Sequence, residues 1–208
     1  MNESPPTLNI VALGSGDFVT QLRASRHQMC TIKAIDSADM VVIDSAVATE
    51  VTTYLDRVLN HARPGLMVVV VSLSHDLASL AALNAAGCMT ALALWNGDKN
   101  WAVISDDEIM AVVLELLASE LHVGFRSIPA AQQATYVAGV LLKHLSQYVA
   151  AHAVRLQSES APMPEPIPAF LLDEQVVARS LGTLADSDLS AVLAAMVNVA
   201  HNPHPKEN

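Results

Sequence analysis

Short apolar runs alternate with stretches of helical spacing over residues 8–121. The runs at residues 8–13, 29–35, 39–44, 66–73 and 88–95 predict five strands. Apolar residues at helical spacing predict helices over residues 17–27, 46–62, 76–86 and 105–121. This alternation predicts an α/β fold, a three-layer sandwich with a mostly parallel five-stranded sheet. A polar turn at residues 96–100 indicates a short edge strand over residues 101–104.

The run from Asp39 to Asp44, with the sequence DMVVID, is the stretch around which the other elements can be arranged. Its four consecutive apolar residues suit a strand that is covered on both faces, as in a parallel sheet. Asp44 falls at the carboxyl end of this strand, the edge where open α/β sheets bind ligands. Alternatively, Asp44 and Ser45 cap the helix that is expected from about Val47.

The first predicted strand ends in the turn Gly14-Ser15-Gly16. Glycine permits a tight strand-to-helix turn, and such a turn can also hold a phosphate or a carboxylate group. The turn has neither the third glycine of GxGxxG nor the Lys-Ser or Lys-Thr pair of a Walker loop.

The pattern changes after residue 121. Residues 122–157 include a long amphipathic helix, expected from Pro129 to Gln157. This helix could fold back on the α/β core, but we expect it to pair with the same helix of a second copy, which gives a homodimer. The predicted interface residues are Tyr136, Val137, Val140, Leu141, Leu145 and Tyr148.

The remaining segments have simpler patterns. Residues 1–7 form a polar leader, 158–168 a proline-rich linker, 169–201 two short helices, and 202–208 a loose tail. The predicted organisation is therefore an α/β domain over residues 8–121 that is followed by a helical C-terminal extension.

Composition narrows the class of protein. The 208 residues are 52% hydrophobic, and the formal net charge of −10 argues against contact with nucleic acid or an anionic membrane surface. Cys30 and Cys88 have no zinc-ligand spacing, and the N-terminus lacks the pattern of a signal peptide. The longest apolar run, residues 66–71, is too short to span a bilayer. We expect a reduced, cytoplasmic protein.

No residue pattern encodes a particular reaction. The eight histidines show no metal-ligand spacing, and no serine lies in a GxSxG motif. The acidic run Asp106-Asp107-Glu108 is typical of a helix start. We therefore predict no catalytic residue, no metal and no cofactor.

The order of elements over residues 8–121 resembles the receiver (CheY-like) superfamily of response regulators. The run ending in Asp44 is similar to the strand that carries the phospho-acceptor aspartate. The run at residues 68–72 is similar to the strand that ends in a conserved hydroxyl residue, here Ser72, and Ala86-Gly87-Cys88 matches the Gly-Ala before the last strand.

Three parts of the receiver pattern differ in this chain, and one of them is the second helix, which is nearly missing. Gly14-Ser15 replaces the acidic pair that binds Mg²⁺, and Leu94-Trp95 falls where the family has a lysine. Without these charges, neither the metal nor a transferring phosphoryl group is neutralised. The resemblance therefore implies an atypical receiver, a class that acts through protein contacts.

Three hypotheses follow. The first is a non-catalytic regulatory or scaffolding module, a homodimer that docks to another protein of a larger assembly. The alternative is a small-molecule-binding or enzymatic Rossmann-like domain. The third is a working phospho-receiver. The candidate ligand-binding residues are Gly14, Ser15, Gly16, Asp44 and Ser72.

Overall fold

The computed structural model describes residues 7–95, 100–157, 166–185 and 188–201. The chain forms two compact units, Met1–Ala130 and Ala131–Asn208, and each is described by itself. The predicted leader, linker, tail and residue 96–100 turn lie wholly or mostly outside the described residues. No helix among the described residues is both long and apolar enough to cross a membrane.

The first unit contains a seven-stranded sheet in the order β2-β1-β3-β4-β5-β6-β7. The strands are β1 (Asn9–Gly14), β2 (Gln28–Cys30), β3 (Met40–Asp44), β4 (Met67–Val71), β5 (Met89–Trp95), β6 (Asn100–Ile104) and β7 (Gly124–Ser127). Neighbouring strands are parallel except β5 and β6, which are antiparallel. The mostly parallel α/β sheet is confirmed.

The sheet has two strands more than the five predicted from apolar runs. β6 does not form an edge, because β7 pairs with it in parallel, with Trp101 opposite Phe125. β7 is only four residues long, and none of them is fully buried. Such a strand carries no apolar run, so its pairing with β6 is the only feature that identifies it.

The second strand is shorter than predicted. Residues 29–35 were expected to form it, but β2 ends at Cys30 and a 3₁₀ helix follows over Ile32–Ser37. The chain must pass from the sheet edge across β1 to β3 within a few residues, which leaves no room for a crossover helix. The Arg63 guanidinium donates hydrogen bonds to the carbonyls of Ile35 and Ala38, which hold this connection.

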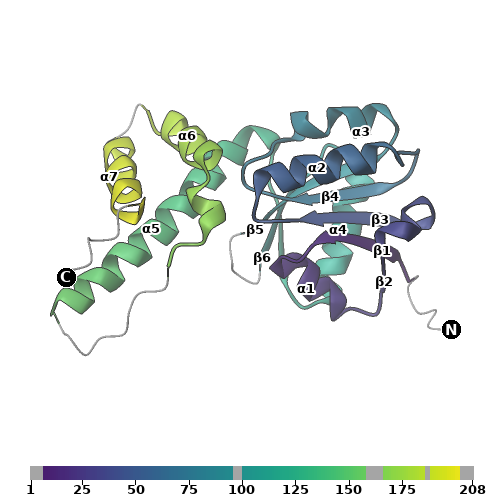
Figure 1. Cartoon of the computed structure of the whole chain (residues 1–208), viewed down its shortest axis with the longest axis horizontal. Helices are drawn as coiled ribbons and strands as arrows, with labels where there is room; N and C mark the ends of the chain where they lie inside the picture. Colours follow the sequence, from purple (N-terminus) through teal and green to yellow (C-terminus); the bar gives the residue numbers. More distant parts are fainter. Residues whose placement is uncertain (1–6, 96–99, 158–165, 186–187, 202–208) are drawn as a thin grey trace. The chain divides into compact units, whose positions relative to one another are not determined.

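Helices cover both faces of the sheet (Figure 1). α2 (Ala48–Leu59) and α3 (Ala81–Ala85), which follows a 3₁₀ turn at Leu77–Leu80, lie on one face. α1 (Asp17–Arg23) and α4 (Glu108–Glu120) contribute to one core cluster on the other face. There the rings of Phe18 and Trp101 stack with centroids 4.2 Å apart. The three-layer sandwich positions the carboxyl end of β3 at the middle of the sheet.

The second unit is helical. It contains α5 (Gln133–Gln157), α6 (Glu174–Thr183), α7 (Leu189–His201) and 3₁₀ turns at Ala130–Gln132 and Ala169–Leu172. α5 packs against both α6 and α7. Of the predicted interface residues, Val137, Val140, Leu141 and Leu145 are buried within the single chain, and Tyr136 and Tyr148 are half-buried. The homodimer stays a prediction.

Candidate functional site

Asp44 lies at the end of a completely buried strand. All five residues of β3 are buried, and Asp44 itself is only 6% exposed. The strand registers place Gly14 of β1 and Val71 of β4 opposite Asp44. The sequence correctly predicted that Asp44 lies at the carboxyl end of a central strand. A continuous apolar run favours a strand that is buried on both faces, and the carboxyl ends of such strands form the edge where α/β sheets commonly bind ligands.

Gly14 and Gly16 allow the first turn to approach Asp44 closely. A Cβ atom on Gly14 would lie 2.0 Å from the Asp44 carbonyl oxygen, and the φ of Gly14 is +99°. A Cβ atom on Gly16 would lie 2.1 Å from the Asp44 Oδ1 atom. The Gly16 N–H also donates a 3.3 Å hydrogen bond to the Asp44 carbonyl. The turn needs both glycines because β3 ends directly against it.

The Asp44 carboxylate faces the first turn of α1. Its Oδ2 atom accepts a 3.0 Å hydrogen bond from the Val19 N–H. Burial raises the pKa of Asp44, and the negative charge of Asp17 adds to this effect, whereas the amides of Val19 and Phe18 oppose it. The Asp44 carboxylate therefore lies against the Gly14–Gly16 turn and is hydrogen-bonded by α1, whereas the binding of a ligand phosphate or carboxylate by this turn stays a prediction.

Ser72 belongs to a different hydrogen-bonded group at the same edge. It directly follows β4, and its Oγ lies 2.8 Å from His75 Nδ1 and 3.1 Å from Ser74 Oγ. The same Oγ accepts the N–H groups of Ser74 and His75. The other ring nitrogen of His75 lies 3.4 Å from Thr52 Oγ1. The sequence analysis did not pair Ser72 with His75, although a separation of three residues in a turn allows this contact.

A crevice of about 390 Å³ opens beside β2, at the edge of the sheet. Its polar groups come from Arg23 at the end of α1, Tyr54 and Arg57 on α2, and Thr31 after β2. The apolar part comes from residues of β1 and β2 and from Ile32. Gly14 lines the crevice as well, whereas Ser15, Gly16, Asp44 and Ser72 do not.

The two arginines of the crevice have no anionic partner among the described residues. Neither Arg23 nor Arg57 makes an ion pair or a side-chain hydrogen bond with any described residue. The crevice lining contains no acidic residue from the part of the chain that the structure describes. Sequence reasoning missed these residues, because Arg23 and Arg57 lie on helices of opposite layers and meet only at the end of the short edge strand β2.

The described residues contain no group of three His, Cys, Asp or Glu side chains that could hold a metal ion. Asp107 is the N-cap of α4, since its Oδ1 accepts the Met110 N–H at 3.0 Å. The acidic run there therefore starts a helix, as the sequence indicated.

No protein-family model matches the chain, and no curated protein matches it. Solved structures do match over nearly its whole length. The 3-hydroxyisobutyrate dehydrogenase of Mycobacterium tuberculosis has a TM-score of 0.65 and 15% identity, with 96% of this chain and 100% of the other covered. The (S)-3-hydroxybutyryl-CoA dehydrogenase of Ralstonia eutropha has a TM-score of 0.54 and 11% identity, with 93% and 94% covered.

A UDP-glucose dehydrogenase from Pyrobaculum islandicum is also similar, with a TM-score of 0.60, 11% identity, and 98% of this chain and 70% of the other covered. These likenesses define the class of fold: a Rossmann-like α/β domain with a helical C-terminal part. The sequence identities are low, so the likeness extends to the fold alone.

The resemblance to receivers was wrong, and so was the regulatory scaffold inferred from it, because the structural neighbours are dehydrogenases. The error has a physical cause. The first five strands have the order β2-β1-β3-β4-β5, which receivers share with other doubly wound folds. Apolar strands and common turns cannot separate these folds, whereas β6, β7 and the C-terminal helices do. The neighbours have the Rossmann-like fold that the alternative hypothesis named.

Proposed function

We propose that the first unit binds a phosphorylated nucleotide in the crevice beside β2. The observation that carries this proposal is the pair of unpartnered guanidinium groups, Arg23 and Arg57, in a single crevice without an acidic residue. A chain with a net charge of −10 has acidic side chains in excess, yet no acidic residue that the structure describes is paired with these arginines. Guanidinium groups bind phosphate through two parallel hydrogen bonds, so a phosphate is the fitting partner.

Position and shape support a nucleotide over a bare phosphate. The crevice adjoins the carboxyl ends of β1 and β2, where doubly wound folds bind nucleotides. Its volume of about 390 Å³ lies in the range of small-molecule sites. Met29, Ile32 and the ring of Tyr54 offer an apolar wall for a base, and the Thr31 hydroxyl can bond a sugar.

A nicotinamide dinucleotide is the cofactor that dehydrogenases of this fold class use for hydride transfer. In such folds the pyrophosphate binds the amides of the first glycine-rich turn. Here the Asp44 carboxylate lies against Gly16 and accepts the Val19 N–H. The crevice with Arg23 and Arg57 fits the nucleotide half, but the turn does not fit a pyrophosphate while the Asp44 carboxylate occupies it.

Oxidoreductase activity is the second candidate, favoured by the dehydrogenase neighbours and by His75. The His75 ring is half-buried and hydrogen-bonded to Ser72 at the carboxyl edge of the sheet. An imidazole in this position is suited to exchange a proton with a substrate hydroxyl. We also propose a cytoplasmic location, because Cys30 and Cys88 are both free thiols.

Titration calorimetry tests the binding proposal. Adenosine, AMP, NAD⁺ and NADP⁺ are titrated into the whole chain, into Arg23→Gln/Arg57→Gln, and into the control Arg126→Gln. Arg126 is an exposed arginine on β7, at the opposite edge of the sheet. We expect AMP to bind, adenosine to bind more weakly, and the double variant to lose about 10- to 100-fold in affinity for AMP.

The outcomes separate the two candidates. Loss of AMP affinity in the double variant but not in Arg126→Gln supports the crevice. Equal AMP affinity in all three proteins, or no nucleotide binding at millimolar concentration, contradicts it. NAD⁺ or NADP⁺ binding more tightly than AMP would favour the oxidoreductase, and a His75→Gln variant with binding but no turnover would then assign the proton transfer.

A further inference from the structure

One side of α4 exposes a row of apolar side chains. Ile109, Val112 and Leu116 are 64%, 54% and 65% exposed. Their spacing of three and then four residues places them on one side of the helix, and we call these three residues the α4 seam. Single exposed apolar residues are common in folded proteins, whereas an aligned row indicates a surface that binds a partner.

The helix does not need the seam for its own packing. Met110, Leu114, Leu117 and Ala118 are buried and belong to the core cluster on this face of the sheet. By helical spacing these residues lie on the side of α4 away from the seam. The seam is therefore carried by a helix that the core already fixes, which lowers the entropic cost of binding.

The seam and the residues beside it have the order of a coiled-coil heptad. With Ile109 at position a, Val112 is at d and Leu116 at the next a. Glu108 and Glu115 then both fall at g, from which charged side chains reach a partner helix. Both glutamates are exposed, and neither forms an ion pair with a described residue.

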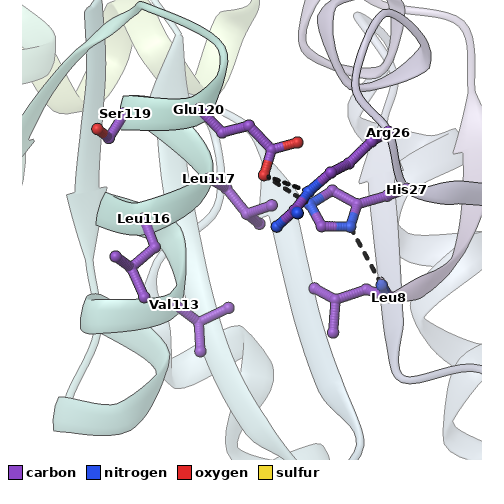
Figure 2. Close-up of a pocket in the computed structure, with 8 residues that line it drawn as sticks. All are labelled: Leu8, Arg26, His27, Val113, Leu116, Leu117, Ser119 and Glu120. Atoms are coloured by element: carbon purple, nitrogen blue, oxygen red, sulfur yellow. Dashed lines mark hydrogen bonds and ion pairs between the residues drawn. The ribbon is translucent and has the colours of Figure 1, made fainter. Parts of the chain in front are cut away.

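The charge beside the seam selects the kind of partner. α4 contains no lysine or arginine. Its glutamate at position e, Glu120, is already paired with Arg26 at 3.0 Å (Figure 2). A second α4 is a poor partner, because antiparallel pairing places the g glutamates opposite each other and parallel pairing places Glu115 opposite Glu120. A helix with Lys or Arg beside its apolar row has the complementary charge.

A cavity of about 490 Å³ borders the seam on the side away from the g glutamates. Val113, Leu116 and Leu117 form its α4 wall, and Leu8 lies across the cavity from them (Figure 2). A large apolar side chain of the partner fits this space, where it would remove hydrocarbon surface from water.

We propose that the α4 seam is a docking surface for an amphipathic α-helix of a partner protein, with Lys or Arg side chains that pair with Glu108 and Glu115. The seam extends over about 10 Å of α4, which corresponds to two turns of helix. The surface is separate from the proposed nucleotide site, since no residue of α4 lines the crevice.

Fluorescence anisotropy with labelled synthetic helices tests the proposal on the whole chain. One peptide consists of three repeats of KIAALKE, with an Ile-Leu row and lysine at e and g. The matched peptide, three repeats of EIAALEK, has the same row with glutamate at e and g. We expect the lysine peptide to bind saturably, and the glutamate peptide to bind at least about tenfold more weakly.

A substitution within the seam locates the binding. Leu116→Glu places a charge in the apolar row and should weaken binding of the lysine peptide by at least about tenfold. The control Val154→Glu introduces the same charge on α5, at a residue that is 56% exposed, and should leave the affinity unchanged.

A charge exchange tests the choice of partner. Glu108→Lys/Glu115→Lys should reverse the preference, so that the glutamate peptide binds more tightly than the lysine peptide. The control Asp56→Lys/Glu174→Lys changes the net charge equally at exposed residues of α2 and α6, and should keep the preference of the parent. All of the substituted side chains are exposed, so each variant is expected to fold.

The proposal is overturned if the lysine peptide binds no more tightly than the glutamate peptide, or if Leu116→Glu binds it as well as the parent does. Equal effects of the two charge exchanges also overturn it, because binding would then follow net charge alone. A dimer of the parent that Leu116→Glu converts to a monomer would assign the seam to a second copy of the chain instead.

Discussion

At the scale of single residues, the contact between Asp44 and the first turn limits which side chains the turn can accept. Gly14 and Gly16 both leave space for Asp44, but they do so differently. Gly14 meets the backbone carbonyl of Asp44, whereas Gly16 meets its side chain. A side chain can rotate away from an added methyl group, but a carbonyl in a central strand cannot move without disturbing the sheet.

Gly14→Ala should lower the free energy of unfolding by more than about 3 kcal/mol, because it combines a positive φ with a backbone clash. Gly16→Ala should cost about 1–2 kcal/mol, since the φ of Gly16 is −69° and only the carboxylate must move. Urea unfolding measures both values. In an Asp44→Ala background, the cost of Gly16→Ala should nearly vanish; an unchanged cost would show that the carboxylate is not the obstacle.

Asp44→Asn should change how stability depends on pH. Because burial raises the pKa of Asp44 in the native state above its ordinary value of 3.8, native protein binds a proton that the unfolded chain has released. Stability therefore falls as pH rises from 3.8 through the raised pKa. Asparagine removes this loss and keeps an acceptor for the Val19 N–H.

We expect the stability of Asp44→Asn relative to the parent to rise through this window and to level off above it. The size is about 1.4 kcal/mol for each tenfold difference in proton affinity between the native and unfolded states. Urea unfolding at a series of pH values between 3 and 8 measures it. A constant difference across that range would mean that Asp44 binds its proton equally well in both states.

At the scale of elements, a capping residue in the sequence can mark the start of a helix. The N-terminus of α4 is an example, since Asp107 caps it through the Met110 N–H. Asp107→Ala should lower the free energy of unfolding by about 1 kcal/mol. The neighbouring exposed Asp106→Ala is the control and should change it by less than about 0.5 kcal/mol. Equal effects in thermal unfolding would exclude the cap as the cause.

The long helix α5 buries part of its apolar face within its own unit, where it packs against α6 and α7. Leu141 is fully buried, so Leu141→Ala should lower the free energy of unfolding of this unit by about 2–5 kcal/mol. Val154→Ala, at a position that is 56% exposed, is the control and should have little effect. Circular dichroism during urea unfolding follows both. A Leu141→Ala variant as stable as the parent would mean that α5 does not pack in this way.

The second strand shows the limit of local signals. Residues 29–35 have the apolar character of a strand, yet only Gln28–Cys30 pair with β1. Where an apolar stretch leaves the sheet depends on the distance that the following residues must cover. A short stretch of sequence does not reveal that distance, so the end of this strand could not be predicted from local patterns.

At the scale of the whole molecule, the chain comprises two units, and the homodimer predicted from the α5 stripe is still to be measured. Sedimentation equilibrium at several concentrations should give twice the mass of one chain. A single-chain mass at all concentrations would contradict the prediction. The buried members of the stripe, among them Leu141, would then serve only the packing of α5 on α6 and α7.

The sequence by itself determined the α/β class, the central position of the β3 run and the location of Asp44 at its carboxyl end, because burial on both faces demands a continuous apolar run. The tertiary structure alone decided the rest. β7 is identified by its pairing with β6. Arg23 and Arg57, from two different helices, line the same crevice. A separate cavity is lined by His27 and by residues of α4. These features depend on which distant segments become neighbours, and local hydrophobic patterns do not encode that.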